Sequence, residues 1–234
     1  MKRLAIAAVR LALVVGLCTM VLTACASGKV VDKTVLVTPT VALTSTPEPK
    51  PAITLDDAPA YLDVSATLPG FRRLDPGAEG MTKEALLGPV LGKDIEKFSD
   101  FELYLSEEPL QYVLMTMGVL SSEMELAAWK AQVRAEKTVP EQAVEDFAKG
   151  FAGRTGLPGT PQYSVDVRDV AVGDYAKLYE ISLLYEGEQS HLDTVWMFQE
   201  NVVAIIYDIW YSPGSPAVDI LTVARAVSSR IANR

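Results

Sequence analysis

Alternation of apolar and polar residues dominates the last third of the chain. At 163–168 the apolar residues Tyr163, Val165 and Val167 occupy every second position, as in a strand with one buried face. Three longer runs follow, each separated from the next by a short turn, so we expect an antiparallel meander. The last run is apolar on both faces, which predicts a central strand covered on both sides. The longer runs are 177–186, 191–200 and 202–211, with turns at 186–189 and 200–201.

The period changes to that of a helix after residue 211. Ser215 and Pro216 predict the cap and the first turn of a helix that runs to the end of the sequence. An apolar stripe with 3-4 spacing predicts its buried face, and Ser228 lies off that stripe. The stripe is Ile220, Ala224, Val227 and Ile231. The apolar sheet residues expected to receive it are Trp196, Phe198, Ile205 and Ile206.

The middle of the chain predicts a hairpin followed by two helices. Residues 100–105 and 110–117 have the pattern of two strands. Ser122 with Glu125, and Thr138 with Glu141, form capping-box signatures that start the helices. The expected helices span 122–137, with the stripe Leu126, Trp129 and Val133, and 140–149, with Val144, Phe147 and Ala148; a shorter helix runs from Thr82 to Leu87. The glycines between 150 and 159 follow a helix and precede a strand, which favours a connection over a phosphate-binding loop.

Taken in order, a strand pair, two helices, four strands and a helix predict an α+β fold: a mainly antiparallel sheet with helices packed against it. One globular domain spanning 53–234 accommodates all of these elements. The closing pattern, with Gly173-Asp174 before the meander, the Glu200-Asn201 turn and then a capped helix, resembles small extracytoplasmic sensor and lipoprotein domains of the PsbP/Mog1 type. The resemblance covers about 75 residues, and a shared fold does not define a function.

The N-terminus has the pattern of an export signal. Lys2, Arg3 and Arg10 precede an uncharged, mostly apolar run at 11–22. A membrane-spanning helix needs about 20 such residues, so the run suits a signal core better than a permanent span. An uncleaved N-terminal helix is the alternative, but Arg10 lies inside the window that it would need.

Leu22, Thr23, Ala24 and Cys25 end this run, and they resemble the lipobox of bacterial lipoproteins position by position. The resemblance implies that Cys25 receives a diacylglycerol, that a signal peptidase recognises Leu22, Thr23 and Ala24, and that residues 1–24 are removed. Acyl chains such as palmitate then anchor the protein, since two chains bind a bilayer stably where one does not. The expected location is the extracytoplasmic side of a cell membrane, with lipid on Cys25 as the membrane contact.

Residues 25–52 therefore form the lipidated cysteine and its tether. This segment is rich in Thr, Val and Pro, and the prolines alternate at 47–51. Such prolines favour an extended polyproline conformation, so we expect a disordered, flexible spacer ahead of the domain.

The net charge of the chain excludes one class of partner. The net charge is −9, and loss of the three basic residues of the signal peptide would make it −12. An acidic protein is repelled by nucleic acid, so we expect no nucleic-acid partner.

Both cysteines, Cys18 and Cys25, lie in the targeting region, so the domain has no disulfide and depends on an ordinary hydrophobic core for its stability.

No motif for catalysis, metal or cofactor binding is present. His191 is the only histidine, which excludes a zinc site built from Cys and His, and we expect it to be a surface residue at a strand end. No G-x-S-x-G sequence presents a nucleophile. The loop at 75–80 resembles the start of a calcium loop, but Gly77 and Leu86 stand where ligands are needed. We therefore expect no metal and no cofactor.

Three functions stay open. The favoured hypothesis is a tethered module that binds or senses a small ligand or an envelope protein. The first alternative is a structural accessory subunit of a cell-envelope complex, which a flat exposed apolar patch would favour. The second is an envelope hydrolase that uses two carboxylates, which sequence alone does not identify because the pair meets only in space.

Overall fold

The computed structural model describes residues 52–79, 82–87, 91–137, 162–185, 187–211 and 214–234. The expected helix at 140–149, the glycines at 150–159, the tether and the signal peptide lie outside the described residues. The expected short helix near Thr82 is present as α3 (Lys83–Leu86).

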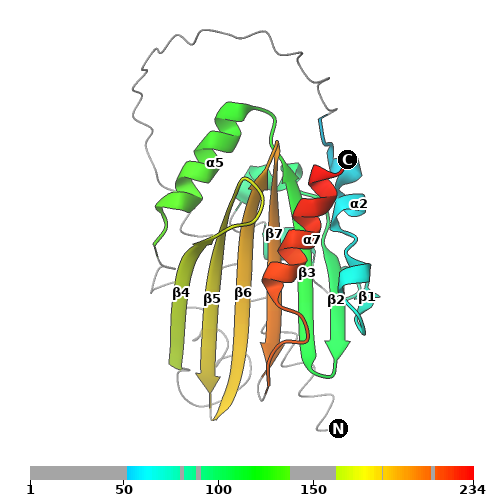
Figure 1. Ribbon diagram of the computed structural model, residues 1–234, viewed down its shortest axis with the longest axis vertical. Helices are drawn as coiled ribbons and strands as arrows, with labels where there is room; N and C mark the ends of the chain where they lie inside the picture. The colour runs from blue at the N-terminus through cyan, green and yellow to red at the C-terminus, as the bar shows by residue number, and fades with distance from the viewer. Residues whose placement is uncertain (1–51, 80–81, 88–90, 138–161, 186, 212–213) are drawn as a thin grey trace.

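Within the described residues, seven strands form a single antiparallel sheet in the order β1-β2-β3-β7-β6-β5-β4 (Figure 1). The expected meander is confirmed, and its last strand, β7, has the predicted bounds and pairs on both sides. Helices cover both faces, so the α+β prediction is also confirmed. The strands are β1 (Arg72–Leu74), β2 (Glu102–Glu107), β3 (Leu110–Val119), β4 (Gln162–Val170), β5 (Tyr175–Tyr185), β6 (Glu188–Gln199) and β7 (Val202–Tyr211).

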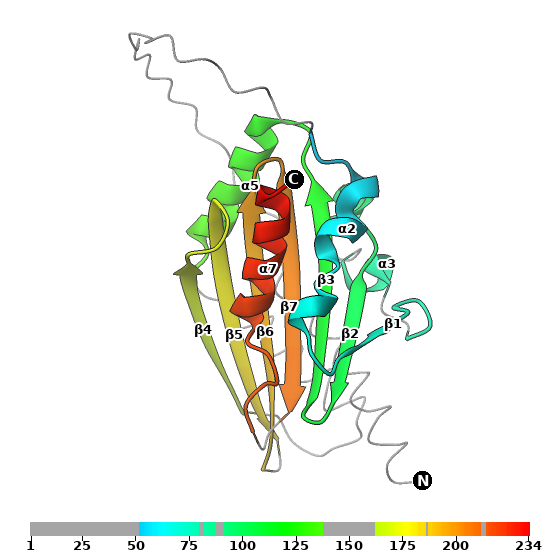
Figure 2. The same cartoon turned by 45° about the vertical axis from the view of Figure 1, so that its right-hand side comes forward.

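One face of the sheet carries α7 (Ile220–Ala232) and α2 (Ala58–Leu62), with the one-turn helices η2 (Leu55–Asp57) and η3 (Ser65–Thr67) beside α2. Figure 2 shows α7 and α2 side by side on the face turned toward the viewer. The predicted stripe of Ile220, Ala224, Val227 and Ile231 is entirely buried there. It packs against the side chains of Met197, Ala204 and Ile206, among others.

The sheet residues expected to receive this helix were therefore mostly wrong. Ile206 does lie beneath α7, but Trp196, Phe198 and Ile205 belong to the core on the opposite face. The error arose because the central strands are apolar on both faces, so their pattern does not say which face a helix covers.

The start of α7 also differs from the expectation at Ser215 and Pro216. The helix begins at Ile220, and the Asp219 carboxylate accepts a hydrogen bond from the N–H of Leu221 as its cap. The Gln111 side chain explains the delay, because its oxygen accepts from the N–H groups of Ala217 and Val218 and its nitrogen donates to the carbonyl of Val218. These three bonds occupy backbone groups that an earlier helix start would need.

The opposite face carries α5 (Glu123–Ala135) together with α3 and η4 (Gly92–Lys97). The predicted stripe is confirmed, since Val133 is buried and Leu126 and Trp129 pack against this core. The capping box is confirmed only in part. Ser122 accepts from the N–H of Glu125, but the Glu125 carboxylate binds Ser121 rather than returning to Ser122.

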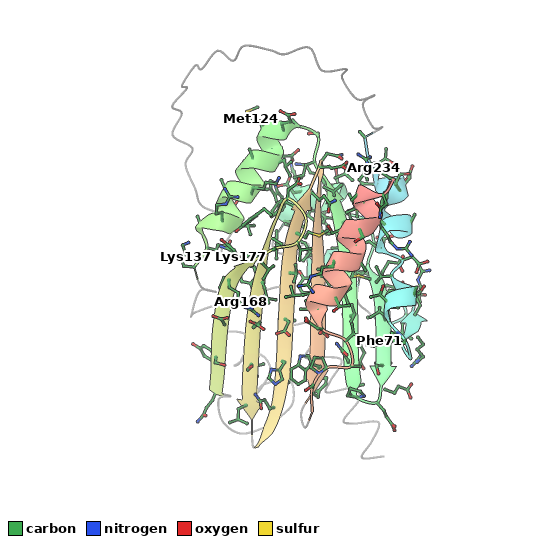
Figure 3. All side chains as sticks on the ribbon, viewed as in Figure 1. Phe71, Met124, Lys137, Arg168, Lys177 and Arg234 are labelled. Atoms are coloured by element: carbon green, nitrogen blue, oxygen red, sulfur yellow. The ribbon has the colours of Figure 1, made fainter. Side chains whose placement is uncertain are left out.

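A buried lysine on β5 forms hydrogen bonds with the C-terminal end of α5. Lys177 begins the predicted strand 177–186, yet it is only 2% exposed. Its ammonium donates to the carbonyl oxygens of Val133 and Arg134, at 2.6 and 3.1 Å, and also to that of Glu136, at the C-terminal end of α5 (Figure 3). Burial lowers the pKa of Lys177, while the charges of Asp169 and Glu136 oppose that shift.

Candidate functional site

Beyond the N-terminal end of α7, the sheet face that carries this helix changes from apolar to polar. We call this region the polar strip. Its residues come from four neighbouring strands and meet through the strand register, in which side chains two apart share a face. One row is Ser164, Ser182, His191 and Trp210; the adjacent row is Asp166, Glu180, Asp193 and Asp208.

His191 and Trp210 lie next to each other at the β7 end of the first row. Their rings are stacked nearly parallel, with centroids 3.7 Å apart and planes 6° apart. The Nδ1 atom of His191 also lies 2.9 Å from the hydroxyl of Ser182. His191 lies near the start of its strand as expected, but it is only partly exposed, because its ring lies between two cross-strand neighbours. Burial lowers the pKa of His191.

Asp193 lies in the second row between Glu180 and Asp208. Burial raises its pKa to about 6, and the negative charge of Glu180 adds to that shift. The indole of Trp210 acts in the opposite direction. Near neutral pH this carboxyl therefore gains or loses a proton easily, and a nearby positive charge would favour the ionised form.

Asp208 lies opposite Asp193 on β7 and is fully buried. The amide nitrogen of Gln111 donates to its two carboxyl oxygens at 2.8 and 2.9 Å. Burial nevertheless raises the pKa of Asp208 well above its usual range, and the charge of Asp193 raises it further. Two carboxyl groups that resist ionisation thus lie opposite each other on adjacent strands.

Arg168 supplies positive charge at the outer edge of the strip. Its guanidinium pairs with Glu180 at 2.8 Å and with Asp166 at 3.6 Å (Figure 3). All three side chains are solvent-accessible, so these pairs contribute little to stability. They leave the strip with more acidic than basic groups.

A shallow hollow adjoins the strip at the β4–β5–β6 end. Its volume is about 200 Å³, smaller than the roughly 300–1,000 Å³ typical of small-molecule sites. This surface therefore suits a partner or a ligand that lies across it better than a fully enclosed small molecule. The lining residues are Gln162, Tyr163, Ser164, Ser182, Leu183, Leu184 and Gln189.

The described residues of the strip offer hydrogen-bonding groups and carboxylates. Ser182 and His191 have the spacing of a nucleophile and its base. Acyl transfer also needs free N–H donors for the developing oxyanion, but both residues lie inside paired strands whose backbone groups serve the sheet. Among the described residues, no three His, Cys, Asp or Glu side chains form a metal-binding group.

The residues predicted from the N-terminal motif, Leu22, Thr23, Ala24 and Cys25, lie outside the described residues. Within the described part of the chain, no helix is long and apolar enough to cross a membrane. The strip itself was missed by the sequence analysis. Its only sequence signal is an acid on the same face of each of four consecutive strands, which becomes visible once the register is known.

No protein-family model matches the chain, and no curated protein matches it. The fold is similar to two solved structures from Mycobacterium tuberculosis. One is the extracellular domain of PknH (TM-score 0.48, 11% identity, 79% of this chain and 99% of that one). The other is LpqN, involved in cell envelope biogenesis (TM-score 0.26, 14% identity, 69% of this chain and 76% of that one). With TM-scores below 0.5, neither similarity bears on function.

Replacing Asp193 with Asn should remove a pH-dependent cost of folding. The carboxyl has a pKa of about 6 in the folded protein and 3.8 as the reference for the unfolded chain. Between these values the folded state binds more protons, so the contribution of Asp193 to stability falls as pH rises. Relative to wild type, Asp193→Asn should therefore gain about 2 kcal/mol between pH 4 and pH 7 in urea titrations. A constant difference across that range would contradict the assignment.

Proposed function

We propose that this chain is a lipid-anchored, extracytoplasmic binding module, and that the polar strip on β4–β7 is its binding surface. The partner carries basic groups that face Glu180 and Asp193. Lipid on Cys25 anchors the module to the membrane, and residues 25–52 act as a spacer between the membrane and the domain. In this proposal the protein binds or senses a partner and does not transform it.

The observation that carries the proposal is the position of two carboxyl groups, Asp193 and Asp208, opposite each other on the adjacent strands β6 and β7. A buried carboxyl costs free energy unless something pairs with its charge. Burial raises the pKa of both Asp193 and Asp208, and the charge of Asp193 raises the pKa of Asp208 further. Ionisable groups whose pKa is shifted by burial are frequent at functional sites. A cation seated over Asp193 would supply the missing compensation.

The two alternatives lack the observations that would favour them. A structural accessory would present a flat apolar patch, but the large apolar residues exposed in the described part are Met124 and Leu184, on different elements. A carboxylate hydrolase needs a cleft around its two acids. Asp208 is fully buried, and the hollow beside the strip is shallow and small.

Titration with an arginine hexapeptide tests the binding surface. We expect the full-length protein to bind this probe at low ionic strength, more tightly as pH rises through 6, because Asp193 ionises there. Glu180→Gln/Asp193→Asn should weaken binding about tenfold, since two close charge pairs are lost. Glu84→Gln/Glu96→Gln removes the same charge from exposed positions elsewhere and is the matched control. Equal losses in both variants would show that only the overall negative charge matters.

Cys25→Ser tests the anchor separately. A serine hydroxyl is a much weaker nucleophile than a thiolate, so the variant should incorporate no fatty acid. We expect wild-type protein in the membrane fraction to be labelled with palmitate and to lack residues 1–24, whereas the variant keeps the uncleaved precursor. An unmodified Cys25 in the intact mass of the native membrane form would contradict the anchor while leaving the strip proposal intact.

A further inference from the structure

The two edge strands of the sheet differ in length, which affects how readily each can pair with a strand of another molecule. β1 forms one edge and has only three residues, whereas β4 forms the other and has nine (Figure 2). β4 pairs with β5 along its full length, and in the described residues no strand lies along its outer side. The backbone groups on such an edge are a template for another strand.

β4 lacks most of the features that usually protect an open edge. Between Gln162 and Val170 there is no proline, glycine or lysine, and its register with β5 is continuous, without a bulge. Tyr163, Val165 and Val167 share one face with Asp169, whereas Asp166 and Arg168 share the other face with Val170. An added strand would therefore meet a regular edge with a defined charge pattern.

The charge pattern fits a second copy of the same strand. If two β4 strands pair antiparallel around Val167, Asp166 of each copy lies opposite Arg168 of the other. Opposite charges in directly facing positions stabilise an antiparallel pair, and like charges destabilise it. Val167 then faces its own copy, while Val165 faces Asp169, a pair that gains nothing.

Neighbouring registers are less favourable. Pairing centred on Asp166 brings two carboxylates face to face, and pairing centred on Arg168 does the same for two guanidinium groups. Of these three registers, the one centred on Val167 is therefore the one in which each Asp166 faces an Arg168.

We propose that the protein forms a dimer in which β4 pairs antiparallel with β4 of a second copy, centred on Val167. The two seven-stranded sheets then form one continuous sheet. Ser164 and Asp166 belong both to this edge and to the polar strip, so the strips of the two copies become contiguous across the two-fold axis.

Charge reversal tests the register directly in the full-length protein, measured by sedimentation in detergent solution. Asp166→Arg alone places two like pairs across the interface, and so does Arg168→Asp alone. Each variant should weaken dimerisation by about tenfold or more, since two attractive pairs become repulsive. In an equimolar mixture of the two variants every facing pair is again opposite in charge, so a mixed dimer should form with wild-type affinity.

Arg225→Asp, which reverses an exposed charge on α7, is the matched control and should dimerise as wild type does. Thermal unfolding of each variant alone separates loss of association from loss of folding, which matters for Arg168→Asp because it also removes the pair with Glu180. Wild-type protein that stays monomeric would overturn the proposal. So would single variants that still dimerise, or a mixture of folded variants that fails to associate.

Discussion

Ile220→Ala should lower the free energy of unfolding by about 2–5 kcal/mol. Ile220 is 3% exposed and begins the buried stripe of α7, which forms much of the core on its face of the sheet. Removing its side-chain carbons loses the transfer free energy of those atoms and leaves a cavity beneath the first turn. Total stabilities of single domains are about 5–15 kcal/mol, so the effect is a large fraction of the whole.

Ser229→Ala is the control for this prediction, because Ser229 is exposed on the same helix and should change stability by less than about 0.5 kcal/mol. Ser228, which lies off the stripe, is not a suitable control. Its hydroxyl donates to the Gln199 side chain at 2.7 Å, and its carbonyl accepts from the same side chain. Equal, small effects of Ile220→Ala and Ser229→Ala in urea titrations would mean that α7 is peripheral.

Lys177→Met should cost about 2–4 kcal/mol, although it replaces a charged residue in the interior with an apolar one. The change relieves the desolvation of the ammonium, a group whose pKa is lowered by burial. It also removes the donor to three carbonyl groups at the end of α5. Leaving one buried and two partly buried acceptors without their donor outweighs the relief, because an unsatisfied buried group costs about 1–3 kcal/mol.

Hydrogen exchange locates the effect of Lys177→Met. The amide protons of α5 should exchange faster than in wild type, while those of α7 on the opposite face should change little. Lys93→Met alters an exposed lysine and should change neither stability nor exchange by a measurable amount. A Lys177→Met variant as stable as wild type would show that the buried ammonium is dispensable for holding α5.

Local periodicity was enough to predict most of the fold. The alternation at β4 and the apolar run of β7 gave strands in the expected places, because those patterns report burial of one or both faces directly. The stripe of α7 was also predicted correctly, since 3-4 spacing specifies one face of a helix.

Long-range contacts account for the differences. The start of α7 depends on Gln111, which lies more than a hundred residues earlier in the chain and bonds the backbone at 217–218. Lys177 is buried because the end of α5 packs over it, and nothing in its own neighbourhood of the sequence indicates that contact. Both features arise only when the complete sheet is assembled.

The polar strip was hidden from the sequence for a similar reason. Asp166, Glu180 and Asp193 each occur at an ordinary polar position of their own strand, and Asp208 is the one acid in the apolar run of β7. Only the register across three strand pairs aligns them. A one-residue slip in any pair would move a residue to the other face. Sequence alone therefore did not identify the candidate site.

The central claim is that the polar strip is the binding surface. The NMR signals of the indole N–H groups of the three tryptophans test it most directly. Trp129 and Trp196 pack in the core on the face that carries α5, whereas Trp210 lies in the polar strip against His191. Adding the arginine hexapeptide to the full-length protein should shift the Trp210 signal and leave the other two in place, and Asp193→Asn should greatly reduce that shift. An unmoved Trp210 signal at peptide concentrations that saturate binding would contradict the assignment of the polar strip as the binding surface.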